Sequence, residues 1–284
     1  MSAEQSLSYS NSDPAYACLV DKSRVEAFRK TIAEVVKVGD VVLEVGAGTG
    51  ILSLFAASAG ARKVYSVEID RLLAKSLVTT ASANNLGKII HVIEGDALQI
   101  KLPRKVDVII AELIDTALID ELQVAVINRL HRTGTIGSRT RVIPCGYETF
   151  VQLVDVDNNF YGYKINAPIH QWPFYSNMNE EWAQIKIRPV SDVVSVGKFD
   201  FQNGFVNSGV NTIVEFNLTK RTKFNAIRLS GKLKLDAERS FGAGNMINGD
   251  KILSIGEHVR EGTVRLKIRY TMSGGLPNFY SEIL

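Results

Sequence analysis

The sequence predicts an α/β fold in which a parallel sheet between helices is followed by an antiparallel β-sandwich or barrel-like part. Before residue 142, short apolar runs such as residues 41–45 alternate with helical stretches, which indicates strands buried on both faces of a parallel sheet. After Pro144, successive segments show period-two alternation, most clearly residues 262–270, which is typical of antiparallel strands with one wet face. A length of 284 residues suits two domains. We therefore expect one domain over residues 1–142 and a second over residues 143–284.

The first expected element is a helix that begins after Asp21, a well-placed N-cap, and ends at Gly39. Its apolar side chains follow the helical spacing at Val25, Phe28, Ile32 and Val35. The first domain should then contain helices over residues 51–59 and 71–84 and strands over residues 41–45, 63–68, 89–93 and 106–111. In the second domain, the pattern predicts strands over residues 147–156, 211–218, 228–235 and 262–270, with an irregular excursion over residues 158–185.

Composition excludes several classes of protein. Apolar residues make up 45% of the chain and charged residues 22%, as in globular proteins rather than disordered or fibrous ones. No membrane-length apolar run or signal peptide is apparent, so we expect a cytoplasmic protein with no membrane partner. Two cysteines, Cys18 and Cys145, are too few for a disulfide framework or a zinc site, and no metal is expected. A net charge of +3 makes nucleic acid an unlikely partner, although Lys and Arg outnumber Asp and Glu twelve to seven from residue 201 onward.

A glycine loop lies between the first strand and the next helix. Gly46, Gly48 and Gly50 stand where the chain must turn sharply and where a ligand can approach the backbone. The dinucleotide fingerprint would need glycine in place of Ile51, and a P-loop would need Gly-Lys-Ser/Thr at the end of the turn. The spacing therefore fits neither of these nucleotide sites.

The spacing matches the first motif of class I methyltransferases, which use S-adenosyl-L-methionine. Glu68 ends the next strand, where a carboxylate can accept hydrogen bonds from both ribose hydroxyls and would repel a 2′-phosphate. Asp96 and Ala97 follow the third strand, where this class often contacts the adenine. The resemblance implies a Rossmann-like domain with S-adenosyl-L-methionine as its cofactor, bound by these residues, by the glycine loop and by Glu44 in the strand before it.

Residues 41–52 and 59–64 resemble the same stretch of the protein arginine methyltransferases, and residues 19–24 are similar to a helix of that family. By that likeness Arg24 would bind the carboxylate of the cofactor as a charge-assisted fork, and Asp21 would hold the arginine. Pro144 matches the proline that joins the two halves of the family's fold. The resemblance implies a protein or peptide substrate and a homodimer.

Glu112 and Glu121 resemble the pair of glutamates that this family uses in catalysis. Glu112 ends the fourth strand and Glu121 follows it by nine residues. A guanidinium has a pKa above about 12 and is not simply deprotonated. Two carboxylates can hold its fork and draw the positive charge to the nitrogens that they contact, so the remaining nitrogen regains a lone pair for attack on the methyl group.

The substrate half departs from the family pattern. Ala15 stands where the family has a histidine, Leu113-Ile114 replaces Trp-Met, and Leu98 replaces a glutamate that contacts adenine. The Thr-His-Trp loop is absent from its expected region, residues 240–248, and the dimerisation arm is shortened to residues 158–185. A small-molecule or RNA acceptor and a non-catalytic cofactor-binding scaffold therefore stay open as alternatives to arginine methylation.

Overall fold

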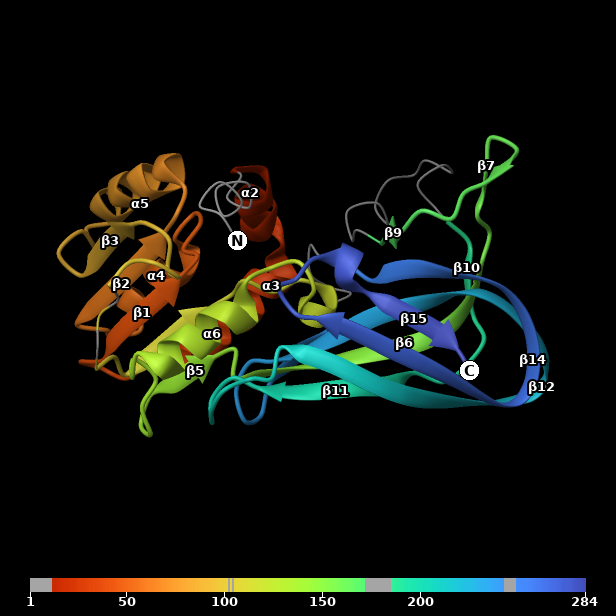
Figure 1. Cartoon of the computed structure of the whole chain (residues 1–284). Helices are drawn as coiled ribbons and strands as arrows, with labels where there is room; N and C mark the ends of the chain where they lie inside the picture. Colours follow the sequence, from red (N-terminus) through yellow and green to blue (C-terminus); the bar gives the residue numbers. More distant parts are fainter. Residues whose placement is uncertain (1–11, 102, 104, 172–184, 243–248) are drawn as a thin grey trace.

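The computed structural model describes residues 12–101, 103, 105–171, 185–242 and 249–284. Two sheets lie beside each other along the long axis of the molecule (Figure 1). Sheet A is parallel and five-stranded, and sheet B is antiparallel and eight-stranded. This confirms the predicted fold class.

Sheet A has the strand order β3-β2-β1-β4-β5, which matches the first five positions of the Rossmann strand order 3-2-1-4-5-6. Every residue of β1 and of β4 is buried, as expected for continuous apolar runs in a parallel sheet. The strands are β1 (Val41–Val45), β2 (Lys63–Glu68), β3 (Ile90–Glu94), β4 (Val108–Ala111) and β5 (Arg141–Ile143). The helices around it are α2 (Ser12–Val20), α3 (Lys22–Val35), α4 (Ile51–Ser58), α5 (Arg71–Ala83) and α6 (Gln123–Arg132).

Sheet B follows the order β10-β6-β12-β14-β15, with β11 on β6, β13 on β12 and β9 on β14. The expected strands 211–218 and 228–235 are parts of one strand, β12 (Gly209–Lys234), because the polar residues between them bulge without ending the pairing with β14 (Lys251–Thr271). The other strands are β6 (Gly146–Val156), β9 (Ile169–His170), β10 (Ile187–Pro189), β11 (Val194–Asp200), β13 (Ser240–Gly242) and β15 (Tyr280–Ile283). A separate hairpin joins β7 (Asn159–Phe160) and β8 (Tyr163–Lys164) within the expected excursion, of which residues 172–184 lie outside the described part.

One hydrophobic core runs through both sheets. It includes Phe28 and Ile109 beside sheet A and Phe224 and Leu266 in sheet B, with Leu118 of the β4–α6 connection among the fully buried residues. The β4–α6 connection is therefore packed between the two halves of the molecule rather than being a surface loop.

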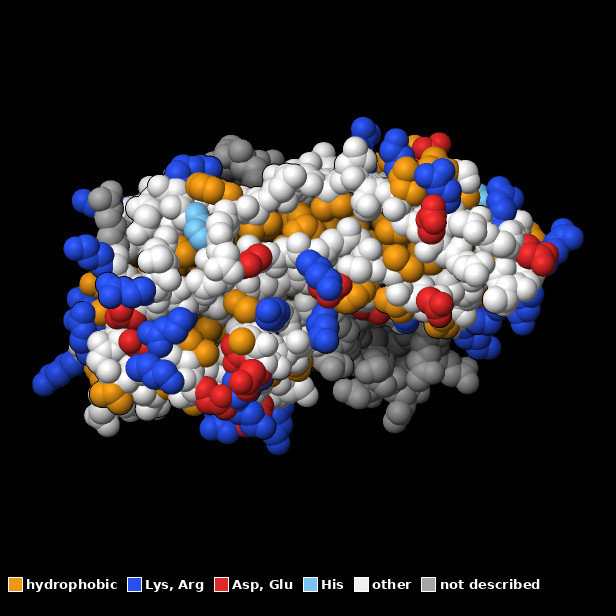
Figure 2. Space-filling model, turned by 90° about the horizontal axis from the view of Figure 1, so that it is seen from below, with side chains coloured by type: hydrophobic (Ala, Val, Ile, Leu, Met, Phe, Trp, Pro, Cys, Tyr) orange, Lys and Arg blue, Asp and Glu red, His pale blue; other side chains and the backbone are white. Residues whose placement is uncertain are grey.

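The surface seen from below carries Lys and Arg side chains toward both ends, with an apolar strip between them (Figure 2). Several cations of sheet B face acidic partners, including Arg265 at 3.3 Å from Glu215 and Lys223 at 3.6 Å from Glu257. Among the described helices, none is long and apolar enough to cross a membrane.

Candidate active site

A cavity of about 220 Å³ lies at the carboxyl ends of β1, β2 and β4, between sheet A and the helices α2 and α3. Ligands of open α/β sheets bind at this edge because the connections that follow the strands converge there. Nine of the ten predicted site residues line the cavity: Arg24, Glu44, Gly46, Gly48, Glu68, Asp96, Ala97, Glu112 and Glu121.

Gly50 is not among the residues that line the cavity. It is the N-cap of α4, with a left-handed φ of 82°, and a Cβ there would lie 1.9 Å from Cδ1 of Leu77. Packing against α5 therefore already requires glycine at this position. At Gly46, a Cβ would lie 2.5 Å from Cδ2 of Leu113, so the chain following β4 passes close to the glycine loop.

Glu68 connects the glycine loop to the start of α5. Its Oε2 accepts the N–H of Gly48 at 2.6 Å, and its Oε1 accepts the N–H of Asp70 at 2.8 Å. The residue is 4% exposed. A carboxylate has about four acceptor sites, so two backbone bonds leave room for further donors. Asp96 caps the turn after β3 through the N–H of Leu98, at 2.8 Å.

Glu44 lies beneath the cavity, 1% exposed. Its carboxyl accepts a hydrogen bond from the hydroxyl of Ser53, which lies 2.5 Å from the hydroxyl of Ser66. Burial raises the pKa of Glu44 to about 8, against an ordinary value of 4.5. The side chain thus joins β1, β2 and α4 beneath the glycine loop.

Arg24 forms a buried ion pair with Glu112, the side chains being 6% and 10% exposed. The guanidinium also donates to the carbonyl of Cys18 at 3.2 Å. Burial alone would lower the pKa of Arg24, but the neighbouring groups, Glu112 first among them, together outweigh burial and raise that pKa. Asp21 does not hold this guanidinium by a side-chain hydrogen bond. It caps α3 by accepting the backbone N–H of Arg24 at 3.1 Å.

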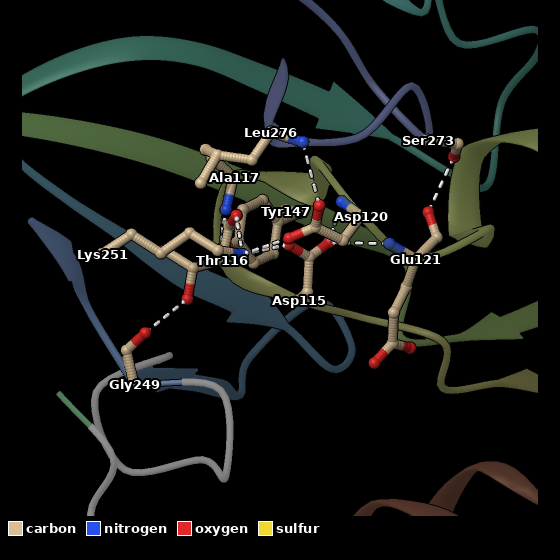
Figure 3. A network of polar contacts seen from close by, with 10 residues as sticks. All are labelled: Asp115, Thr116, Ala117, Asp120, Glu121, Tyr147, Gly249, Lys251, Ser273 and Leu276. Carbon is tan, nitrogen blue, oxygen red and sulfur yellow. Dashed lines mark hydrogen bonds and ion pairs between the residues drawn. The ribbon is translucent and has the colours of Figure 1, made fainter. Parts of the chain in front are cut away.

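Glu112 and Glu121 stand at the two ends of the connection between β4 and α6, here called the acidic loop (residues 112–122). Both line the cavity. The backbone of Glu121 is held on both sides, since its N–H donates to Asp115 Oδ1 at 3.2 Å and its carbonyl accepts from Ser273 Oγ at 2.8 Å. Its carboxylate points away from these contacts (Figure 3).

Two features of the site were not anticipated. Cys18 lines the cavity, and burial raises the pKa of its thiol to about 12, so the thiol is neutral at pH 7. Asp115 is 4% exposed and pairs with Lys251 of sheet B. The only sequence signal for this second pair was an aspartate that directly follows two apolar residues of the acidic loop. Among the described residues, no cluster of three or more His, Cys, Asp or Glu side chains is arranged to hold a metal ion.

Comparison with known proteins agrees with this geometry. Residues 18–136 match the family model of the TRM5/TYW2 methyltransferase domain. The uncharacterized protein MJ1452 of Methanocaldococcus jannaschii is 31% identical over 265 residues, which cover 92% of this chain and 93% of that protein. The chain belongs to one family with this archaeal protein, and its matched domain is that of a class I S-adenosylmethionine-dependent methyltransferase.

The methyltransferase also resembles protein arginine methyltransferases. It is 51% identical to protein arginine N-methyltransferase PRMT10 of Arabidopsis thaliana over 85 residues. These residues cover 29% of this chain and 21% of that protein. The methyltransferase thus matches about a fifth of that relative's length. The Trypanosoma brucei PRMT1 enzyme–prozyme complex with AdoHcy shares its fold, with a TM-score of 0.68 at 18% identity over 95% of this chain and 96% of that chain.

Proposed function

We propose that this methyltransferase transfers the methyl group of S-adenosylmethionine to a guanidinium nitrogen of an arginine in a protein or peptide. The observation that carries the proposal is the position of Glu112 and Glu121, which line one cavity together with the glycine loop and Glu68. The named relatives include arginine methyltransferases, in agreement with such an acceptor.

The cavity fits the cofactor by the chemistry of its side chains. Gly46 and Gly48 bring bare backbone to its wall, Glu68 offers remaining acceptor sites to ribose hydroxyls, and Arg24 offers a buried cation to a carboxylate. Asp96 and Ala97 line the part of the cavity that follows β3, where we place the adenine. When bound, S-adenosylmethionine supplies an electrophilic methyl group on a sulfonium.

The two carboxylates supply orientation and charge. Glu112 and Glu121 hold the guanidinium fork of the substrate and concentrate its positive charge on the nitrogens that they contact, so that the third nitrogen becomes nucleophilic. This nitrogen displaces S-adenosylhomocysteine as the leaving group and, once methylated, releases one proton to water. The attraction of Glu112 for a cation is stronger than in water because its side chain is only 10% exposed. Holding the nitrogen in line with the methyl group contributes much of the rate, since a near-attack geometry needs the reacting atoms about 3 to 3.5 Å apart.

The experiment compares Glu121→Gln with a matched control, Glu26→Gln, an exposed acid on α3 that pairs with Arg29. With an arginine-rich peptide, Glu121→Gln should lower kcat by more than about tenfold, as loss of one charged transition-state contact does. Its affinity for S-adenosylhomocysteine should be unchanged, and the control should match the wild type. Equal rates in the Glu121→Gln variant would contradict the assignment.

The same methyl-transfer assay also identifies which molecule accepts the methyl group. A peptide with lysine in place of each arginine should receive no methyl group. Transfer to RNA or to a small guanidino compound, with none to peptides, would replace the proposed acceptor. Tight binding of S-adenosylhomocysteine with no transfer to any acceptor would indicate a non-catalytic scaffold.

The domain boundary, the homodimer and the cytoplasmic location stay predictions. The domain boundary at residue 142 is supported by the end of β5 at Ile143 and the start of β6 at Gly146. Light scattering on the purified chain tests the homodimer. Fractionation of the source cells tests the cytoplasmic location.

A further inference from the structure

The acidic loop is fastened to sheet B by a buried lysine. Lys251 is the first residue of β14 and is 4% exposed. Its Nζ lies 2.5 Å from Oδ2 of Asp115 and 3.0 Å from Oδ2 of Asp120 (Figure 3). A buried ammonium is costly unless it is paired, and here two carboxylates of one loop pair with it.

The side chain of Asp115 links Lys251 to the backbone of Glu121. While Oδ2 of Asp115 faces Lys251, its Oδ1 accepts the backbone N–H groups of Asp120 at 3.1 Å and of Glu121 at 3.2 Å. Hydrogen bonds to an ionised carboxylate are about twice as strong as those between neutral groups. The position of the Glu121 backbone therefore depends on where Lys251 holds the Asp115 carboxylate.

Further groups of sheet B and of the segment after it hold the same loop. Ser273 Oγ donates to the carbonyl of Glu121 at 2.8 Å, and the N–H of Leu276 donates to Oδ1 of Asp120 at 3.0 Å. The hydroxyl of Tyr147 accepts the N–H of Ala117 at 3.1 Å. With the Glu121 backbone held in this way, its carboxylate is directed away from the network (Figure 3).

The backbone of the loop also requires such support. Ala117 and Leu118 both adopt a left-handed conformation, with φ of 64° and 58°, and both are fully buried. Residues with a Cβ rarely adopt this region, and they persist there only where surrounding contacts fix them. The loop thus owes its shape to contacts with sheet B rather than to its own sequence.

We propose that Lys251 is a positioning residue for methyl transfer, which, through Asp115, holds the Glu121 backbone so that its carboxylate faces the substrate. This inference rests on the proposed function, in which Glu121 binds the guanidinium. Lys251 itself contacts neither the cofactor region nor the substrate region, since it does not line the cavity.

The experiment compares Lys251→Met with Arg239→Met in the full chain. Arg239 is a matched control because it also joins the two halves, by an ion pair with Glu34 of α3, and has no ion pair with the acidic loop. Lys251→Met should lower kcat at least tenfold and leave the affinity for S-adenosylhomocysteine within twofold of the wild type. Arg239→Met should retain kcat. Lys251→Arg, which keeps the charge, should recover part of the loss.

Hydrogen exchange gives a readout that does not depend on activity. In Lys251→Met, the amides of Asp120 and Glu121 should lose at least tenfold in protection, while those of sheet A keep theirs. If the wild type methylates no acceptor, the proposed function fails, whereas the exchange result still tests the positioning role. Unchanged protection of these two amides, or unchanged kcat beside an active wild type, would overturn the inference.

A second variant keeps the test decisive if Lys251→Met does not fold. Ser273→Ala removes only the hydroxyl that holds the Glu121 carbonyl, and Ser273 is partly exposed. It should lower kcat at least threefold without changing the affinity for S-adenosylhomocysteine. A wild-type kcat in this variant would show that the bond from Ser273 does not position Glu121.

Discussion

The buried pair of Arg24 and Glu112 should be strongly coupled, and a double-mutant cycle measures that coupling. Two unit charges about 4 Å apart attract each other by about 4 kcal/mol at an effective dielectric constant of about 20. Exposures of 6% and 10% leave little water to screen them. Arg24→Gln and Glu112→Gln should each destabilise the protein by about 3 to 5 kcal/mol, because each leaves one buried charge without its partner.

The double variant should lose about 2 to 4 kcal/mol less than the sum of the two single losses, since it leaves no charge unpaired. Urea unfolding of the wild type and the three variants at pH 7 gives the four free energies. A coupling below about 0.5 kcal/mol, as found for exposed pairs, would refute the view that this pair is desolvated.

The same variants separate the two roles proposed for the pair. Arg24→Gln should weaken S-adenosylhomocysteine binding about 10- to 100-fold, the loss of one charged hydrogen bond of about 1.5 to 3 kcal/mol. Glu112→Gln should bind this ligand at least as tightly as the wild type, because Arg24 then has no competing carboxylate. Calorimetry measures both affinities, and a weaker affinity in Glu112→Gln would contradict the placement of the cofactor carboxylate at Arg24.

Three other variants test the neighbourhood of the glycine loop. Burial raises the pKa of Glu44 to about 8, so between about pH 4.5 and pH 8 the folded protein keeps a proton that the unfolded chain releases. The contribution of Glu44 to the free energy of unfolding therefore falls as the pH rises from about 4.5 to about 8. Glu44→Gln should remove that decline, so that urea unfolding gives a larger gain in the free energy of unfolding at pH 8 than at pH 5. An equal gain at both pH values would contradict the raised pKa of Glu44. Gly50→Ala should cost at least about 2 kcal/mol in thermal unfolding, from its left-handed φ and the contact with Leu77, and a wild-type Tm would count against that contact. Glu68→Gln should weaken S-adenosylhomocysteine binding about tenfold, and an unaltered affinity in calorimetry would argue against its ribose role.

The parallel sheet and the gathering of the predicted residues could be anticipated because both follow from chain order. Strands that alternate with helices form a parallel sheet, and the residues after their carboxyl ends meet at one edge. Gly46, Glu68, Asp96 and Glu112 are each placed at such a strand end, so local patterns were enough to bring them to the same cavity.

The contacts that were missed join segments far apart in the chain. No local pattern shows that Arg24 faces Glu112, because that depends on how α3 sits against β4. Lys251 begins a strand of alternating pattern, where a lysine is expected to face water, yet it is 4% exposed. Only its partner hints at the burial, since Asp115 directly follows two apolar residues of the acidic loop, and a buried carboxylate needs a cation from elsewhere.

The bond between Lys251 and Asp115 bears on how the two halves of such enzymes can be recombined. A chimera that receives another enzyme's second half without a lysine at this place would bury an aspartate with no counter-ion. Exchange of the acidic loop alone, without an aspartate at position 115, would leave the buried ammonium of Lys251 without this partner. A design that changes the acceptor specificity of this protein must therefore exchange Lys251 and Asp115 together, although more than a hundred residues separate them in the chain.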